Sequence, residues 1–113
     1  MLVDWKQLLQ SAMEALGELG KGNPKIMEGV KALGEAGAAH GALDDKTREL
    51  ISLAVAVTTR CETCIAVHTK MAVAAGASRE ELIEAMGVAV NLNAGAAMVY
   101  ASHVIDAYDM LSK

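Results

Sequence analysis

Aromatic side chains are nearly absent from this chain of 113 residues, which contains one Trp, two Tyr and no Phe. Hydrophobic residues nevertheless make up 53% of it, so Ala, Val, Leu and Met must form most of the core. Such small and aliphatic residues favour closely packed helices over a sheet, because strands prefer β-branched and aromatic side chains. We predict an all-α helical bundle, formed by residues 1–113 as a single domain.

Basic clusters, long apolar runs and a secretion signal are also lacking. The net charge is −4, and no Lys/Arg cluster with interleaved aromatics occurs, which argues against a nucleic-acid partner. The strictly apolar run Leu53–Val57 is far too short to cross a bilayer. Asp4 and the polar residues after it are unlike a signal peptide. We therefore expect a cytoplasmic protein without a membrane partner.

The apolar content is high for so short a chain. A domain of this length buries only about two-thirds of its surface on folding. Some apolar surface is then left over, and a subunit interface is the natural place for it. We expect a homo-oligomer.

Helical periodicity and turn signals divide the chain into about six helices. Apolar residues recur in steps of three and four from residue 2 to residue 19, which predicts an amphipathic helix. Asn23-Pro24 then opens a second helix, which we expect to end near His40. The buried stripe of this second helix is predicted to be Ile26, Val30, Leu33 and Gly37.

The third predicted helix is the central one. Asp44 is a good N-cap, and residues 50–57 are apolar nearly all round. The β-branched pair Thr58-Thr59 weakens a helix and can cap a new one. We predict a bend or short break near residues 58–61, which sets a fourth helix to begin at the two cysteines.

Two further helices follow. Gly76 is suited to the left-handed position that closes the fourth helix, and Ser78 with Glu81 has the capping-box spacing that starts the fifth. A break at residues 91–95 separates the fifth from a last helix at about 94–111. This last helix carries two apolar stripes, and we expect one to face the core and the other a neighbouring subunit. The stripes are Ala97, Ala101, Val104, Tyr108 and Leu111, and Ala96, Val99, Ala107 and Met110.

The chemistry-bearing residues are concentrated in Cys61-x-x-Cys64-x-x-x-His68. Residues three and four apart share one face of a helix, so the two thiols can form a disulfide with the imidazole beside the second. Two cysteines without a secretion signal indicate redox or metal chemistry rather than a structural staple. The helix dipole, worth roughly 0.3–1 kcal/mol when exposed, favours the Cys61 thiolate, whereas the nearby base favours Cys64. We predict that Cys64 attacks and that Cys61 resolves the sulfenic acid.

Glu49 is an acid inside an otherwise apolar run, twelve residues before Cys61. It is placed to orient His68 as the third member of a nucleophile–base–orienter site. A surface carboxylate paired with Lys46 or Arg48 is an equally weighted alternative. An unbroken helix would hold Glu49 about 18 Å from Cys61.

Glu49, eleven further residues, Cys61-x-x-Cys64, three more and His68 together resemble the signature of the alkylhydroperoxidase D-like branch of the carboxymuconolactone decarboxylase family. The resemblance covers about residues 23–110. It implies an all-helical fold, trimers or hexamers, and a peroxidase that reduces a hydroperoxide with a lipoyl-type or thioredoxin-like dithiol as reductant. It also implies that Cys64 is peroxidatic, that Cys61 is resolving, and that Glu49 and His68 relay protons. No cofactor and no metal are expected.

One position departs from this pattern. Thr63 stands where the alkylhydroperoxidase proper carries a further histidine, two residues after the first cysteine. The proton relay implied by the resemblance is therefore shorter in this chain.

Other interpretations remain open on the sequence. Cys61, Cys64 and His68 with either His40 or His103 are a possible zinc set, although three ligands on one helix face make tetrahedral closure awkward. The cysteines could also be buried and inert. A cofactor-free decarboxylase would use the same acid and base without the thiols. A redox-sensing oligomer would cycle the disulfide with little turnover.

Overall fold

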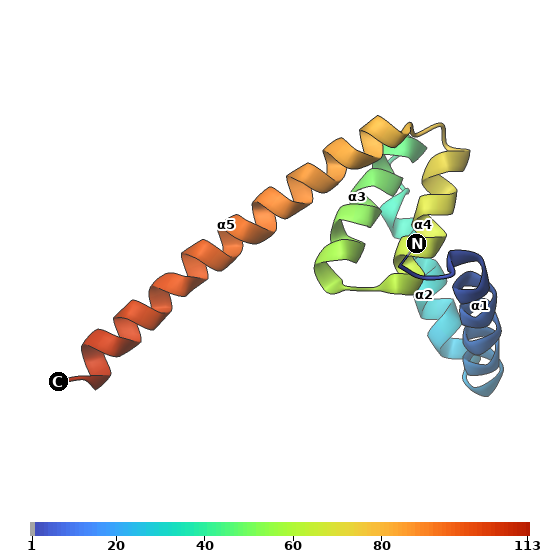
Figure 1. Ribbon diagram of the computed structural model, residues 1–113. Helices are drawn as coiled ribbons and strands as arrows, with labels where there is room; N and C mark the ends of the chain where they lie inside the picture. The colour runs from blue at the N-terminus through green and yellow to red at the C-terminus, as the bar shows by residue number, and fades with distance from the viewer. Residues whose placement is uncertain (1) are drawn as a thin grey trace.

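The computed structural model describes residues 2–113, which form five α-helices and no strand. The helices are α1 (Trp5–Gly22), α2 (Pro24–Gly37), α3 (Asp45–Thr59), α4 (Glu62–Ala74) and α5 (Arg79–Leu111) (Figure 1). The prediction of an all-α fold is confirmed, with one helix fewer than expected.

The helices form a small centre with two projecting parts. α3 and α4 pack against each other, α1 packs along α4, and the first half of α5 packs on α3, while α2 contacts only α1 among the described residues. Figure 1 shows the rest of α5 running away from the other helices. The radius of gyration is 18.4 Å, compared with about 13 Å for a compact domain of this length. The isolated chain is therefore far from globular.

The core lies where α3, α4 and α5 meet, and it is built from small side chains. The buried residues of the described part of the chain are Leu53 and Ala56 on α3, Ala72 on α4 and Ala89 on α5. Alanine at these crossings lets the helix backbones approach closely, which a chain poor in aromatics requires. The central position predicted for residues 50–57 is right for two of them, but Val55 is 55% exposed.

The helix N-termini follow the sequence signals closely. The Asp44 carboxylate accepts the Thr47 N–H at 2.8 Å, as predicted for the cap of α3. Ser78 and Glu81 form both bonds of the capping box, at 3.1 Å and 2.9 Å. Pro24 is the first residue of α2, although the Asn23 side chain makes no capping bond.

The helix C-termini agree less well. Gly76 has a left-handed φ of 89° just beyond α4, as predicted. By contrast, α2 ends at Gly37, three residues before the expected His40. Local signals at the end of α2 are weak, because neither Pro nor a basic residue closes it.

The predicted break at residues 91–95 is wrong, because α5 continues through it without interruption. The Asn93 side-chain amide donates to the Ala89 carbonyl at 2.7 Å and to the Thr58 hydroxyl at 2.8 Å. Asn93 therefore satisfies its amide inside the helix and also ties α5 to α3. Gly95 alone costs a helix only about 1 kcal/mol relative to Ala, which the long helix tolerates.

The stripe predicted to be buried on α2 is exposed in this chain, and so is the stripe of the last helix that was expected to face the core; the other stripe of that helix, expected to face a neighbouring subunit, is exposed as well. Leu33 of α2 is 74% exposed and Leu111 of α5 is 83% exposed. We call residues 96–111 the outer half of α5; every one of them is exposed. Periodicity reports that a helix has an apolar face, but only the tertiary structure shows whether another element covers it.

α5 also has the length and composition of a membrane-crossing helix, with a mean hydropathy of 1.5 over its most apolar 18 residues. The search for uninterrupted apolar runs missed this helix, because Gly, Asn and Ser interrupt the apolar residues of α5. Its inner half packs on α3 and carries the buried Ala89.

Candidate functional site

The connection between α3 and α4 is where the sequence predicted a break, and the break is present. α3 ends at Thr59, and Arg60 adopts a left-handed conformation (φ 58°, ψ 45°). Such a conformation costs a non-glycine residue about 1 kcal/mol or more, so the surrounding structure must hold it. The Thr58 and Thr59 hydroxyls bond back to carbonyls of α3 rather than capping a new helix. Arg60, rather than a threonine, turns the chain.

Cys61 is the N-cap of α4. Its sulfur accepts the backbone N–H of Cys64 at 3.2 Å, which satisfies one of the free N–H groups at the helix start. The two cysteines form a disulfide with their Cα atoms 5.2 Å apart. Both are half-buried, so the pair is neither enclosed in the core nor fully exposed. The helix N-terminus and a directed N–H thus act on the Cys61 sulfur, as the dipole argument predicts.

Glu49 and His68 meet because α4 folds back along α3. Nδ1 of His68 lies 2.6 Å from Oε2 of Glu49, although the two residues are nineteen apart in sequence. The His68 side chain is 31% exposed and the Glu49 side chain 13% exposed, so the contact is largely shielded from water. A carboxylate only accepts, so Nδ1 carries the hydrogen and Nε2 of the neutral ring is left to take a proton.

The alternative partners considered for Glu49 are engaged elsewhere. Lys46 bonds to Glu81 at 2.8 Å, which ties the start of α3 to the start of α5, and Arg48 pairs with Asp45. The hydrogen bond from Lys46 holds the pKa of the Glu81 carboxyl below its usual value. Glu49 is therefore the carboxylate that faces His68, and not part of the surface pairs beside it.

The histidines considered as a fourth zinc ligand lie apart from the cysteines. His40 is exposed in the turn after α2, and His103 is on the outer half of α5, with its ring 4.6 Å from that of Tyr100. No group of three or more His, Cys, Asp or Glu side chains within residues 2–113 is placed to hold a metal ion. His103 is thus an exposed residue in this chain and not a core histidine.

A hollow of about 700 Å³ opens between α1 and α4. Its lining is Trp5, Lys6, Leu9, Ile65, Ala66, Thr69 and Lys70. Sequence reasoning missed this feature, because it assigned the first helix only an amphipathic pattern and no binding site. The signal available was the chain's single Trp on that helix, since large aromatic side chains often line binding sites.

Comparisons with known proteins found relatives that are similar over nearly the whole chain. The chain is 50% identical over 110 residues to an uncharacterized protein of Haemophilus influenzae, covering 97% of both chains. It is 39% identical over 101 residues to an uncharacterized protein of the cox locus of Paracoccus denitrificans, covering 89% of this chain and 91% of the other.

A solved structure is also similar. The crystal structure of an apo carboxymuconolactone decarboxylase family protein from Legionella pneumophila superimposes with a TM-score of 0.74 at 36% identity, covering 96% of this chain and 97% of that one. The profile described as "Carboxymuconolactone decarboxylase family" matches residues 24–107, which include all of α2 to α4 and most of α5. This chain therefore belongs to the carboxymuconolactone decarboxylase family.

Proposed function

We propose that this protein is a thiol-dependent peroxidase that reduces a hydroperoxide through Cys61 and Cys64. The observation that carries the proposal is the 2.6 Å contact between Glu49 of α3 and His68, which lies on the helix that begins at the disulfide. A redox-active pair next to an oriented base is the arrangement that thiol chemistry needs. A cofactor-free decarboxylase would have no use for the cysteine pair.

The resting dithiol is activated by His68. Cys64 lies four residues before His68 on α4, so the two side chains are neighbours on one helix face. Nε2 of His68 takes the Cys64 proton, and Glu49 stabilises the imidazolium through Nδ1–H. A low-dielectric setting strengthens this pair, and Glu49 is mostly buried.

Peroxide reduction then follows in two steps, attack on the peroxide and disulfide formation. The Cys64 thiolate attacks the distal oxygen of ROOH, the O–O bond breaks, and the alkoxide takes the imidazolium proton to leave as ROH. Cys64 is now a sulfenic acid. The Cys61 thiolate attacks its sulfur and forms the disulfide, and the hydroxide that leaves takes up a proton to become water. The N–H of Cys64 and the start of α4 favour the Cys61 thiolate in this second step.

An external dithiol restores the enzyme by thiol–disulfide exchange and is itself oxidised to a disulfide. The cytoplasm maintains such dithiols in reduced form, which is the setting we propose for the protein. A lipoyl-type or thioredoxin-like reductant meets this need. Thr63 is uncharged and lacks a ring nitrogen, so the proposed relay consists of His68 and Glu49 without a second imidazole between the cysteines.

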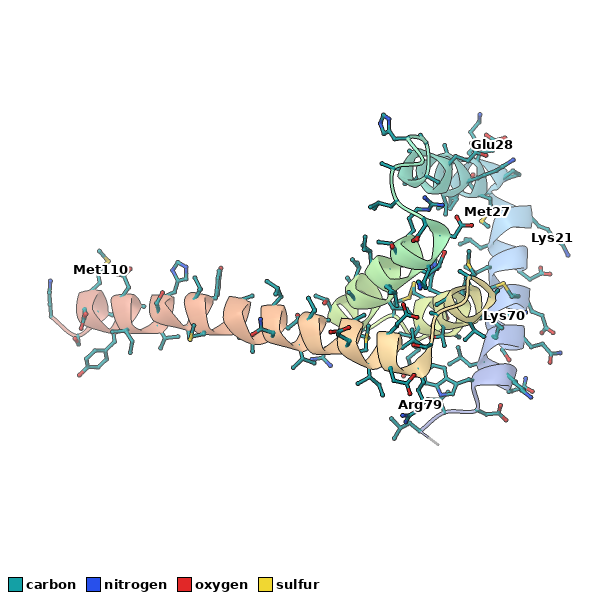
Figure 2. The ribbon with its side chains drawn as sticks, turned by 90° about the horizontal axis from the view of Figure 1, so that it is seen from above. Lys21, Met27, Glu28, Lys70, Arg79 and Met110 are labelled. Carbon is teal, nitrogen blue, oxygen red and sulfur yellow. A yellow bond between two sulfur atoms is a disulfide. The ribbon has the colours of Figure 1, made fainter. Side chains whose placement is uncertain are left out.

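We further propose that the working form is a homo-oligomer, a trimer or a hexamer. The support is the outer half of α5, which exposes apolar side chains over about four turns. Figure 2 shows Met110 close to the far end of this helix, away from the other helices of the chain. Covering this surface with copies of the chain would remove a patch that is unusually large for a monomer.

The test treats the reduced protein with one equivalent of an organic hydroperoxide and counts free thiols. We expect two thiols to be lost from the parent. Cys64→Ser should keep its remaining thiol and should not consume peroxide. Cys61→Ser should consume one equivalent of peroxide and retain a sulfenic acid that a dimedone-type reagent traps. Unchanged thiols in the parent, or peroxide consumption by Cys64→Ser at the parent's rate, would contradict the proposal.

A further inference from the structure

The hollow between α1 and α4 has a mostly apolar lining with two positive charges. Trp5, Leu9 and Ile65 are its large apolar side chains, and the exposed Lys6 and Lys70 add two ammonium groups. Figure 2 shows Lys70 where α4 and α1 lie side by side. A volume of about 700 Å³ lies in the range of small-molecule sites, roughly 300–1,000 Å³.

The two lysines are free to bind an external anion. Among the ion pairs formed within residues 2–113, those of lysine involve Lys21, Lys25, Lys31 and Lys46, and none involves Lys6 or Lys70. The other residues of the lining are apolar or neutral, so no carboxylate of the hollow competes for the two lysines. This combination selects an apolar chain with a negative head group over a cation or an uncharged polar molecule.

The hollow also shares its helix with the disulfide. Ile65 directly follows Cys64, lies four residues after Cys61 and three before His68, and lines the hollow. Residues three and four apart are neighbours on a helix surface, so Ile65 lies next to Cys61 and His68. A chain bound in the hollow therefore contacts a side chain that neighbours the disulfide.

We propose that the hollow binds the chain of a long-chain carboxylate, with Lys6 and Lys70 holding the carboxylate. Resting on the proposed function, the substrate is then a hydroperoxide of such a carboxylate, and Ile65 is the side chain that both the acyl chain and the sulfur pair contact. The binding itself does not depend on the peroxidase chemistry.

The outer half of α5 from another copy is the competing occupant, since it is apolar and carries Asp106 and Asp109. Size argues against it. The hollow is lined by residues 5–9 of α1 and 65–70 of α4, which rise only about 6 Å and 8 Å along their axes. A helix with its side chains is about 10–12 Å across, which is wider than these lining segments are long. A flexible acyl chain fits the shorter space.

Trp5 is the only Trp in the chain, so its fluorescence reports on the hollow directly. We would titrate the full-length protein with dodecanoate below its micellar concentration. A saturable change of Trp5 emission is expected, with affinity falling about fourfold for each methylene removed between dodecanoate and octanoate. Dodecyltrimethylammonium, of opposite charge and equal chain length, should give no saturable change.

Lysine variants test the head-group site. Lys6→Gln and Lys70→Gln should each weaken dodecanoate binding about two- to fivefold, as expected for exposed ion pairs. Lys21→Gln is the matched control, because Lys21 lies on the same helix as Lys6 and outside the hollow, and it should leave the affinity unchanged. A bromine-labelled dodecanoate should quench Trp5 in the parent, which keeps the test valid if a variant folds poorly.

Three outcomes would overturn the site: no saturable response, equal weakening by Lys21→Gln, or a Trp5 response that appears only on dilution with dissociation of subunits. The last would assign the hollow to a second copy. The two proposals fail separately. Dodecanoate binding without thiol loss to any hydroperoxide would leave the site and remove the peroxidase, whereas thiol loss without dodecanoate binding would do the reverse.

Discussion

The corner formed by α3 and α4 and the outer half of α5 are both rich in apolar residues, but they have opposite surroundings. In the corner, Ala56 and Ala72 are buried against other helices of the same chain. On the outer half of α5, Val104 and Tyr108 are each 68% exposed. The same kind of residue therefore forms a core in one region and an uncovered surface in the other. What differs is whether the chain returns to cover the helix, as α4 does to α3.

The largest expected effect is on the chemistry of the corner. Glu49→Gln keeps the shape of the side chain but removes the charge that stabilises the His68 imidazolium. We expect the rate of peroxide-dependent disulfide formation to fall about 10- to 100-fold, less than the 10²–10⁴ attributed to a general base itself. Stopped-flow thiol loss against pH would measure this. Glu84→Gln, an exposed acid on α5, is the control; an equal loss there would show a general charge effect.

The next test concerns the outer half of α5. Val104→Asp places a charge on its exposed apolar surface, so an assembly that buries this surface should dissociate to monomers. Analytical ultracentrifugation would show the change in mass, while circular dichroism should show the helix content retained. Asp109→Asn is the matched control and should leave the mass unchanged. A parent protein that is already monomeric would refute the assembly proposed for this helix.

A pair of alanines compares the two regions directly. Ala72→Leu inserts a large side chain into the buried crossing, and overpacking should lower the free energy of unfolding by about 1–3 kcal/mol. Ala101→Leu, on the exposed outer half of α5, should change it by less than about 0.5 kcal/mol in the monomeric Val104→Asp background. Urea unfolding would measure both. Equal losses would mean that the outer half is packed against something.

The smallest expected effect is at the half-exposed bond between Lys46 and Glu81. The pKa of Glu81 is lowered by this hydrogen bond, so its contribution to stability is present above the unfolded value of 4.5 and is lost as the pH falls through the lowered folded value. Glu81→Gln retains the capping-box geometry but not the charge. Its urea midpoint should therefore fall less steeply than the parent's between pH 5 and pH 3. An unchanged pH profile would show that the pair contributes nothing.

Most of the fold was predictable because the signals are local. The caps at Asp44 and Ser78, the left-handed Gly76 and the interruption after Thr59 each depend on residues within one helical turn. The break at 91–95 was mispredicted because Asn93 finds its partner on α3, 35 residues away in sequence, and no local signal reports such a bond. Interactions of this range lie outside what periodicity and capping can show.

The sequence by itself determined that the chain is helical, where the helix carrying Cys61 begins, and that Cys64 and His68 share one face of it, because each follows from spacing and backbone chemistry. Only the tertiary structure decided that Glu49 meets His68, since that contact requires the left-handed turn at Arg60 and the return of α4 along α3. It also decided that the apolar stripes of α5 remain uncovered. An apolar stripe indicates that a helix has a face to bury, and the arrangement of the helices in space determines what covers that face.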